Sequence, residues 1–167
     1  MKTVLNPPNK LRSKVRGVSG PPDPNMIKNI DNKIEDMGRS YLDWARQDLL
    51  AINKLLREII DKNAFDQQIL EEIHGIIIEM RGQGGSFGYP QITQVGRLFS
   101  IFIDALLQAR HLDETALELC KNFTNTIDII LKSGKDPQTI SGLHHVIQGM
   151  EKAMKVYAKR QQIDLPY

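Results

Sequence analysis

The sequence is poor in the residues that build disulfides and metal sites. Cys120 is its only cysteine, so no disulfide can form within the chain. The four histidines do not combine with cysteine in the spacing of zinc ligands. We therefore expect no bound metal and no cofactor, and a location in a reducing compartment, the cytoplasm.

Long apolar runs are missing as well. No stretch approaches the ~18 apolar residues of a membrane-spanning helix, and the apolar stretch within residues 1–8 is too short for a secretory signal. Apolar and polar residues do not alternate with a period of two over a useful length, so no sheet is predicted. We expect a protein without a membrane partner.

The first 25 residues differ in composition from the rest of the chain. They carry five basic residues against Asp23 alone, together with five prolines and two glycines. Such a segment cannot bury enough apolar surface to offset the entropy of ordering it. Its dispersed charges, without interleaved aromatic residues, would bind nucleic acid only weakly. We expect residues 1–25 to be a flexible leader, residues 26–162 to be a helical domain, and nucleic acid not to be a partner.

Beyond the leader, apolar residues recur at three- and four-residue steps, the pattern of amphipathic helices. Asp23-Pro24 predicts a helix start, because the aspartate can accept from first-turn amides and the proline needs no amide hydrogen there. Gly38 is a candidate position for a bend in this first helix. We expect helices at about 24–59, 64–84, 90–109 and 113–133, the last capped by Gly134, and a fifth from Asp136-Pro137 to about 157.

Each helix has one expected inward stripe. In chain order the stripes are Ile27, Ile30, Ile34, Met37, Tyr41, Trp44, Leu49, Ile52, Leu55, Leu56 and Ile59; Ile69, Ile73, Ile76 and Met80; Ile92, Val95, Leu98, Phe99, Phe102, Leu106 and Ala109; Leu117, Cys120, Phe123, Thr124, Ile127 and Leu131; and Ile140, Leu143, Ile147, Met150, Met154 and Tyr157. Short connections between five such helices favour an all-α, antiparallel up-and-down bundle. We expect a four-helix core plus one additional helix, preceded by a disordered N-terminal leader.

Four glycines lie in or just after the second helix, within Arg81-Gly82-Gln83-Gly84-Gly85-Ser86-Phe87-Gly88. Each glycine inside a helix costs about 0.5 to 1 kcal/mol relative to alanine. The group therefore indicates a close approach by a partner or by neighbouring backbone. The alternative is that the helix simply ends at Gly82.

From Ile78 to about Phe99 the chain resembles the signature of histidine-containing phosphotransfer (HPt) domains, which carry phosphate between receiver domains in multistep two-component signalling. The family pattern is a histidine, a basic residue three positions later, a glycine at four, small residues at five to seven, an apolar-glycine pair at nine and ten, and a following helix with leucines and a glycine. This chain supplies Arg81, Gly82, Gln83-Gly84-Gly85, Phe87-Gly88, and then Ile92, Val95, Gly96 and Leu98.

The chain departs from this family at the position that performs the chemistry. Ile78 stands where the phosphate-accepting histidine is expected, and isoleucine has no nitrogen that could accept a phosphoryl group. The resemblance implies that the basic residue, here Arg81, neutralises phosphoryl charge, and that the glycines admit the loops of a receiver. Because neither feature depends on the imidazole, we expect the chain to dock a receiver although it cannot transfer phosphate.

Helical geometry places Ile78 on the solvent side of the second helix, with Glu71, His74 and Arg81 on the same face. Burial of part of this isoleucine would contribute about 1 to 2 kcal/mol to docking. No catalytic residue is expected. The expected binding residues are Ile78, Arg81, Gly82, Gln83, Gly85, His74 and Glu71.

His74 is the one plausible replacement for the missing acceptor. It lies one turn before Ile78, displaced by about 6 Å along the axis. The position three residues after it is Ile77 rather than a basic residue, so we favour a structural role in which His74 pairs with Glu71 or packs beside Ile78.

The remaining histidines are weaker candidates. His144-His145 lack a further ligand three or four residues later, and His111 falls in a predicted turn.

These observations lead to one main hypothesis and two alternatives. The chain is expected to be a phosphorelay protein of HPt architecture that docks response-regulator receiver domains or histidine kinases without carrying phosphate, and it is not expected to be an enzyme. The first alternative is active phosphotransfer through His74. The second, from another class, is a helical scaffold or dimerisation module in which the glycines form a tight turn between helices.

Overall fold

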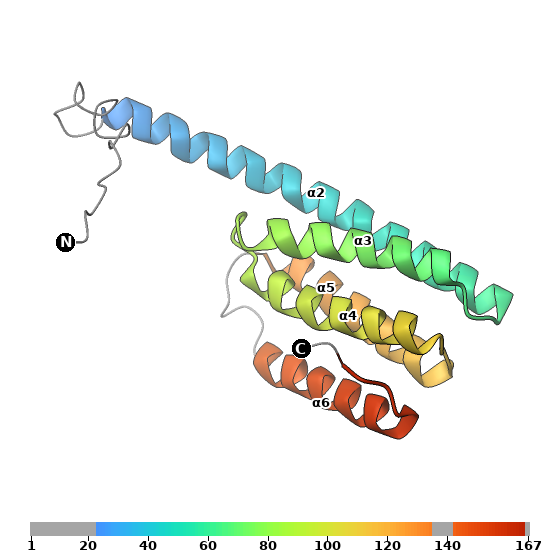
Figure 1. The fold of residues 1–167 in the computed structure, drawn as a ribbon. Coiled ribbons are helices and arrows are strands. Elements are labelled where there is room, and N and C mark those ends of the chain that lie inside the picture. Colours follow the sequence, from blue (N-terminus) through green and yellow to red (C-terminus); the bar gives the residue numbers. More distant parts are fainter. Residues whose placement is uncertain (1–22, 135–141, 166–167) are drawn as a thin grey trace, which may run out of the picture. The chain divides into compact units, whose positions relative to one another are not determined.

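The computed structural model describes residues 23–134 and 142–165 (Figure 1). The described part contains five α-helices and no strand: α2 Pro24–Lys62, α3 Gln67–Gly84, α4 Pro90–Ala109, α5 Glu114–Ser133 and α6 Leu143–Gln161. The chain divides into two units, residues 1–34 and 35–167. Helix α2 begins in the first unit, and the core belongs to the second. The predicted all-α class is confirmed.

Helix α2 begins where the sequence predicts. The Asp23 carboxylate accepts a hydrogen bond from the amide of Asn25 at 2.9 Å, and the helix then continues through Gly38 without a break. It therefore begins inside the segment that was predicted to be a leader. Residues 1–22 of that predicted leader lie outside the described residues.

The buried stripe of α2 differs from the predicted one. Tyr41, Ala45 and Leu49 are buried at four-residue steps, and the predicted residues from Ile52 to Ile59 follow them into the core. Ile27, Met37 and Trp44, which were predicted to be buried, are exposed, Trp44 to 53%. The prediction was wrong because a four-residue step from Tyr41 selects the small Ala45 instead of Trp44. The side chains of Ile30 and Ile34 lie outside what the structure describes.

Helix α3 begins three residues later than predicted, at Gln67. Asp66 fixes this start, because its carboxylate accepts from the amide of Ile69 at 3.1 Å and pairs with Lys62 at 2.7 Å. Ile77 is buried and Ile76 is only half-buried, so the predicted stripe was wrong by one residue there. Its other three members are buried as expected.

Helix α4 lies at the centre of the bundle and contacts α3, α5 and α6. Pro90 opens it, as predicted, and its predicted stripe is buried except for Ala109, which is exposed at the last turn. Phe99 stacks on Phe123 of α5 with ring centroids 4.9 Å apart. Most of the circumference of α4 is buried, because three helices surround this helix.

Helix α5 has the predicted limits. The Asp113 carboxylate caps its first turn by accepting from the amide of Ala116 at 2.8 Å, and Gly134 ends it with a φ of +78°, a conformation that favours glycine. The predicted stripe is buried, apart from Leu117, which is half-buried.

Helix α6 packs on α4 and α5 as the additional helix. The ring of Tyr157 meets Phe102 edge to face at 5.6 Å, and Gln161 donates to the Asp113 carboxylate at 2.9 Å. The described helix starts at Leu143. The predicted start at Asp136-Pro137, and with it Ile140, lies outside the described residues.

Neighbouring helices of the bundle run antiparallel. The Tyr41 hydroxyl of α2 donates to the carbonyl of Met80, near the end of α3, at 3.3 Å. Across the next pair, His74 of α3 faces Asp104, near the end of α4. Figure 1 shows α4 between α3 and α6. Within the described ranges, no helix combines the length and the apolar character needed to span a bilayer.

We predict that Asp113→Ala lowers the free energy of unfolding by about 1 to 2 kcal/mol, because it removes the cap of α5 and leaves Gln161 without its acceptor. The measurement is urea unfolding followed by circular dichroism. The matched control is Asp128→Ala, which removes an exposed pair with Lys132 and should change stability by less than about 0.5 kcal/mol. Equal losses in the two variants would contradict the capping role.

Candidate docking face on helices α3 and α4

Ile78 is a large apolar residue that the fold leaves in contact with solvent. Its side chain is 41% exposed, whereas the adjacent Ile77 is 1% exposed. The helix turns by about 100° per residue, so one of two neighbouring isoleucines points into the core and the other points outward. The bundle therefore does not need an apolar side chain at position 78.

Two glycines flank Ile78 along the helix. Gly75 and Gly82 lie three residues before it and four residues after it, on the same side of α3. A methyl group built on either would meet nothing within 4 Å. Ile78 thus projects from a strip of bare backbone, which another protein could approach closely.

Arg81 is held against α4 by a close approach of the two helices. A methyl group built on Gly96 would lie 2.7 Å from the Cβ of Arg81, so only glycine fits at this crossing. The Arg81 guanidinium donates to the Ser100 hydroxyl at 2.8 Å, and the Arg81 carbonyl accepts from the Thr93 hydroxyl at 2.9 Å. Ser100 donates in turn to the carbonyl of Arg97 at 3.0 Å. The cation is therefore fixed half-buried beside Ile78.

His74 also faces α4. Its Nε2 lies 3.2 Å from a carboxylate oxygen of Asp104, and the His74 side chain is 21% exposed. Its partner is thus Asp104 rather than Glu71 or the flank of Ile78, which were the predicted structural neighbours. The carboxylate of Glu71 accepts from Gln67 on its own helix at 2.8 Å.

We define the Ile78 face as Glu71, His74, Gly75, Ile78, Arg81, Gly82 and Gly85. These residues lie within roughly 120° of the circumference of α3, and among them Arg81 and His74 meet polar residues of α4. Six of them were singled out from the sequence, and Gly75 was not. Gln83, the remaining predicted binding residue, lies about 140° around the helix from Ile78 and does not belong to this face.

The glycine-rich segment serves more than one purpose. Helix α3 ends at Gly84, as predicted, and the alternative of an end at Gly82 is wrong. A methyl group on Gly84 would lie 3.1 Å from the carbonyl oxygen of Tyr89 and 3.2 Å from the hydroxyl of Tyr41. A side chain at Gly84 would therefore crowd neighbouring parts of the chain, which agrees with one of the two predicted explanations, a close approach by neighbouring backbone. Gly82 has no such internal reason.

The turn after α3 is anchored to α2 by aromatic contacts. The ring of Phe87 stacks on Tyr41 at 5.1 Å, and Gly88 adopts a φ of +86°. Burial raises the pKa of the Tyr41 hydroxyl, with a smaller contribution from the negative charge of Asp48. Tyr41 is thus a neutral hydrogen-bond donor at ordinary pH, and it fixes the end of α3.

Sequence reasoning missed the polar residues of α4 that border the Ile78 face. Ser100 and Asp104 follow Gly96, which the family pattern already included, at four-residue steps, so the three residues share one side of α4. Ser100 and Asp104 interrupt an otherwise apolar stretch of this helix. That interruption is the signal that could have revealed them.

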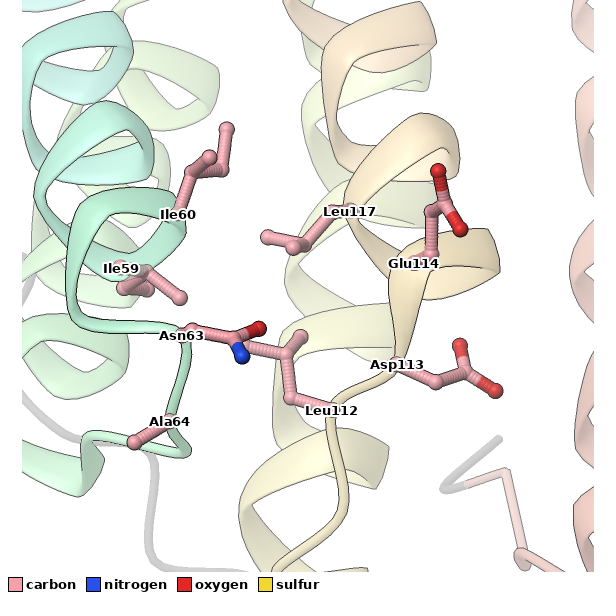
Figure 2. A pocket seen from close by; sticks show the side chains of 8 residues that line it. All are labelled: Ile59, Ile60, Asn63, Ala64, Leu112, Asp113, Glu114 and Leu117. Atoms are coloured by element: carbon pink, nitrogen blue, oxygen red, sulfur yellow. The ribbon is translucent and has the colours of Figure 1, made fainter.

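Several hollows of the described surface lie away from the Ile78 face. One of about 270 Å³ lies between the end of α2 and the start of α5 (Figure 2), and it is lined by Ile59, Ile60, Asn63, Ala64, Leu112, Asp113, Glu114 and Leu117. Figure 2 shows the carboxylates of Asp113 and Glu114 pointing away from the two isoleucines. The carboxylate of Asp113 already accepts the capping hydrogen bond of α5, so it is not a free reactive group of this hollow.

The other chemically active side chains do not gather into a site. His144 and His145 are exposed in the first turn of α6, and His111 lies 3.5 Å from Asp113. Cys120 is fully buried, and burial raises its thiol pKa to about 12. Over residues 23–134 and 142–165, no group of three His, Cys, Asp or Glu side chains is placed to hold a metal ion.

Comparison with protein-family models, with curated proteins and with solved structures finds no match to this chain.

We predict that Gly96→Ala lowers the free energy of unfolding by about 1 to 3 kcal/mol, because the added methyl group forces α3 and α4 apart at Arg81. The matched control is Gly75→Ala, also inside a helix but with open space around it, which should raise stability by about 0.5 to 1 kcal/mol. Chemical denaturation of both variants gives the comparison. A stabilising Gly96→Ala would show that the two helices are not in such close contact.

Proposed function

We propose that this chain is a two-component phosphorelay protein of HPt architecture that docks a receiver or histidine kinase domain through the Ile78 face, without carrying phosphate at position 78. The observation that carries the proposal is the exposed Ile78 between two open glycines and beside a fixed Arg81. In this proposal the protein is a binding partner and not an enzyme.

The composition of the Ile78 face suits docking. A partner that covers Ile78 would remove an exposed apolar side chain from water, which is worth about 1 to 2 kcal/mol. Gly75 and Gly82 let partner backbone come close to α3, since no side chain extends from these positions. The half-buried Arg81 supplies a positive charge whose side-chain freedom is already restricted by Ser100, so little further entropy is lost when it meets an acidic partner loop.

The geometry favours docking without phosphate over transfer through His74. The ring nitrogen Nε2 of His74 faces the carboxylate of Asp104 at 3.2 Å. A phosphoryl group on this nitrogen would stand next to that negative charge, and the repulsion disfavours the phosphorylated state. The basic Arg81 is directed to Ser100 rather than to His74.

A cytoplasmic location is part of the proposal. It is supported by Cys120, a free thiol in a buried position, which is typical of proteins from reducing compartments.

We predict that Ile78→Asp and Arg81→Glu each weaken binding of the cognate receiver domain by about 10-fold or more, since each removes a contact worth roughly 1.4 kcal/mol. Binding is measured by isothermal titration calorimetry with receiver domains from the same genome. The matched control is Ile60→Asp on α2, because Ile60 is exposed to a similar extent, 37%, and should leave affinity unchanged. Unchanged affinity in both Ile78→Asp and Arg81→Glu would place docking elsewhere.

Ile78→His should convert the docking protein into a phosphate acceptor. The imidazole would take the phosphoryl group from a labelled phospho-receiver, forming an acid-labile nitrogen–phosphorus bond while the receiver's own bond to phosphorus breaks. We expect no label on the wild-type chain, clear label on Ile78→His, and at least about 10-fold slower labelling of the double variant Ile78→His/Arg81→Glu.

His74→Ala separates the alternatives in the same assay. Label on the wild-type chain that disappears in His74→Ala would establish active transfer through His74 instead. If the chain binds no receiver, and if no label is transferred even to Ile78→His, the scaffold alternative becomes the better account.

A further inference from the structure

Helix α6 has a second apolar stripe that the bundle does not use. Val146, Gly149, Ala153 and Val156 follow one another at steps of three, four and three residues, so they share one side of the helix. Val146 is 48% exposed and Val156 is 43% exposed, and Gly149 and Ala153 are exposed as well. This stripe lies beside the buried stripe of Met150, Met154 and Tyr157, on the side nearer α5.

The stripe borders an uncharged groove. A hollow of about 410 Å³ runs between α5 and α6, lined by Leu119, Asn122, Phe123, Asn125, Thr126, Ile129, Val146, Gly149, Met150 and Ala153. None of these ten side chains carries a charge, and Ile129 on the α5 rim is 51% exposed. In a surface helix that carries Lys152, Lys155 and Lys159 on its other sides, and Arg160 one turn beyond Val156 at the end of the stripe, such an uncharged stretch is typical of a contact surface.

The stripe is symmetric about its own centre. Val146 and Val156 lie five residues on either side of position 151, and Gly149 and Ala153 lie two residues on either side of it. If a second α6 is laid antiparallel on the first, each valine meets the other valine and the small residues meet at the crossing. Such self-complementarity is what a two-fold interface between identical chains requires. Binding of an unrelated partner would not need this symmetry.

We propose that two copies of this chain associate through antiparallel packing of α6 on α6, with the helix of each copy seated over the α5–α6 groove of the other. Gly149 and Ala153 allow the two helix backbones to approach closely at the two-fold axis. Val156 of one copy then reaches the rim formed by Val146 and Ile129 of the other.

The surface is large enough for a stable dimer. Helix α6 has 19 residues, so it is about 28 Å long. A strip of that length and two helices wide, about 20 Å, projects onto roughly 560 Å² before the relief of the side chains is counted. The two copies together would bury roughly 1,120 Å², which is more than the ~1,000 Å² in total that a specific interface needs. Exposed Lys152 lies beside the stripe, where water and salt screen its repulsion of its counterpart.

Dimerisation through α6 leaves the Ile78 face free. The α5–α6 groove is lined only by residues of α5 and α6, and the Ile78 face belongs to α3. The inference therefore does not depend on the proposed docking function. A dimer of this kind would present two Ile78 faces at once, which suits a dimeric or clustered partner.

The first test is the oligomeric state of the full chain, by sedimentation equilibrium up to about 100 µM, a range in which a standard-size interface is populated. We expect a mass near twice the 19.0 kDa of one chain. Gly149→Glu should raise the dissociation constant by about 100-fold or more, because it places a charge at the two-fold axis. The bundle itself has open space at Gly149, and glutamate is the better helix former, so this variant should melt no lower than the wild-type chain at concentrations where both chains are monomeric.

Gly75→Glu on α3 is the matched control, since Gly75 is also a helical glycine with open space around it. It should leave the dimer intact. A wild-type chain that stays monomeric overturns the proposal, and so does a dimer that Gly149→Glu does not weaken. A dimer broken by Gly75→Glu but not by Gly149→Glu would mean that the copies associate through the Ile78 face.

Cysteine cross-linking tests the antiparallel register. Val146→Cys and Val156→Cys chains are mixed and oxidised, and buried Cys120 should not compete, because burial raises its thiol pKa to about 12. The antiparallel arrangement predicts that position 146 links to position 156 in preference to linking with itself. Preferential links between two copies of the same variant would indicate parallel packing and overturn the proposed geometry.

Discussion

The close approach of α3 and α4 at Gly96 is the constraint on which the Ile78 face depends. With only a hydrogen at this position, the backbones come close enough for Ser100 to receive the Arg81 guanidinium and for Thr93 to reach the Arg81 carbonyl. The same alignment brings Asp104 to His74. A wider helix separation would release both basic side chains to solvent and change the charge presented beside Ile78.

The sequence predicted the bundle well, because apolar periodicity and helix caps are local signals. Pro90, Asp113 and Gly134 mark helix ends that the structure confirms. The errors arose where the choice of face depends on tertiary contacts. Periodicity alone could not decide between Ala45 and Trp44, because they lie four and three residues after Tyr41 and both steps fit a helical stripe.

For the candidate site, the sequence indicated which residues matter but not how they are held. The exposure of Ile78 followed from helical geometry, and the structure agrees with it. The pairing of His74 could not be foreseen, since its partner Asp104 lies 30 residues away on another helix. Helix registry between α3 and α4 is set by the Gly96 contact, and a single sequence does not contain it as a local pattern.

The helical glycines fall into two groups, those crowded by other parts of the chain and those with open space around them. At Gly96 a side chain would overlap Arg81, and at Gly84 it would crowd Tyr89 and Tyr41, so the fold itself favours glycine at both positions. Gly75, Gly82 and Gly149 meet nothing within 4 Å, yet each costs helix stability of about 0.5 to 1 kcal/mol relative to alanine. Two of these three flank exposed Ile78, and the third lies in the apolar stripe of α6. A cost without an internal benefit, placed beside exposed aliphatic side chains on two separate faces, is what the proposed docking face and the proposed α6 dimer surface would each account for.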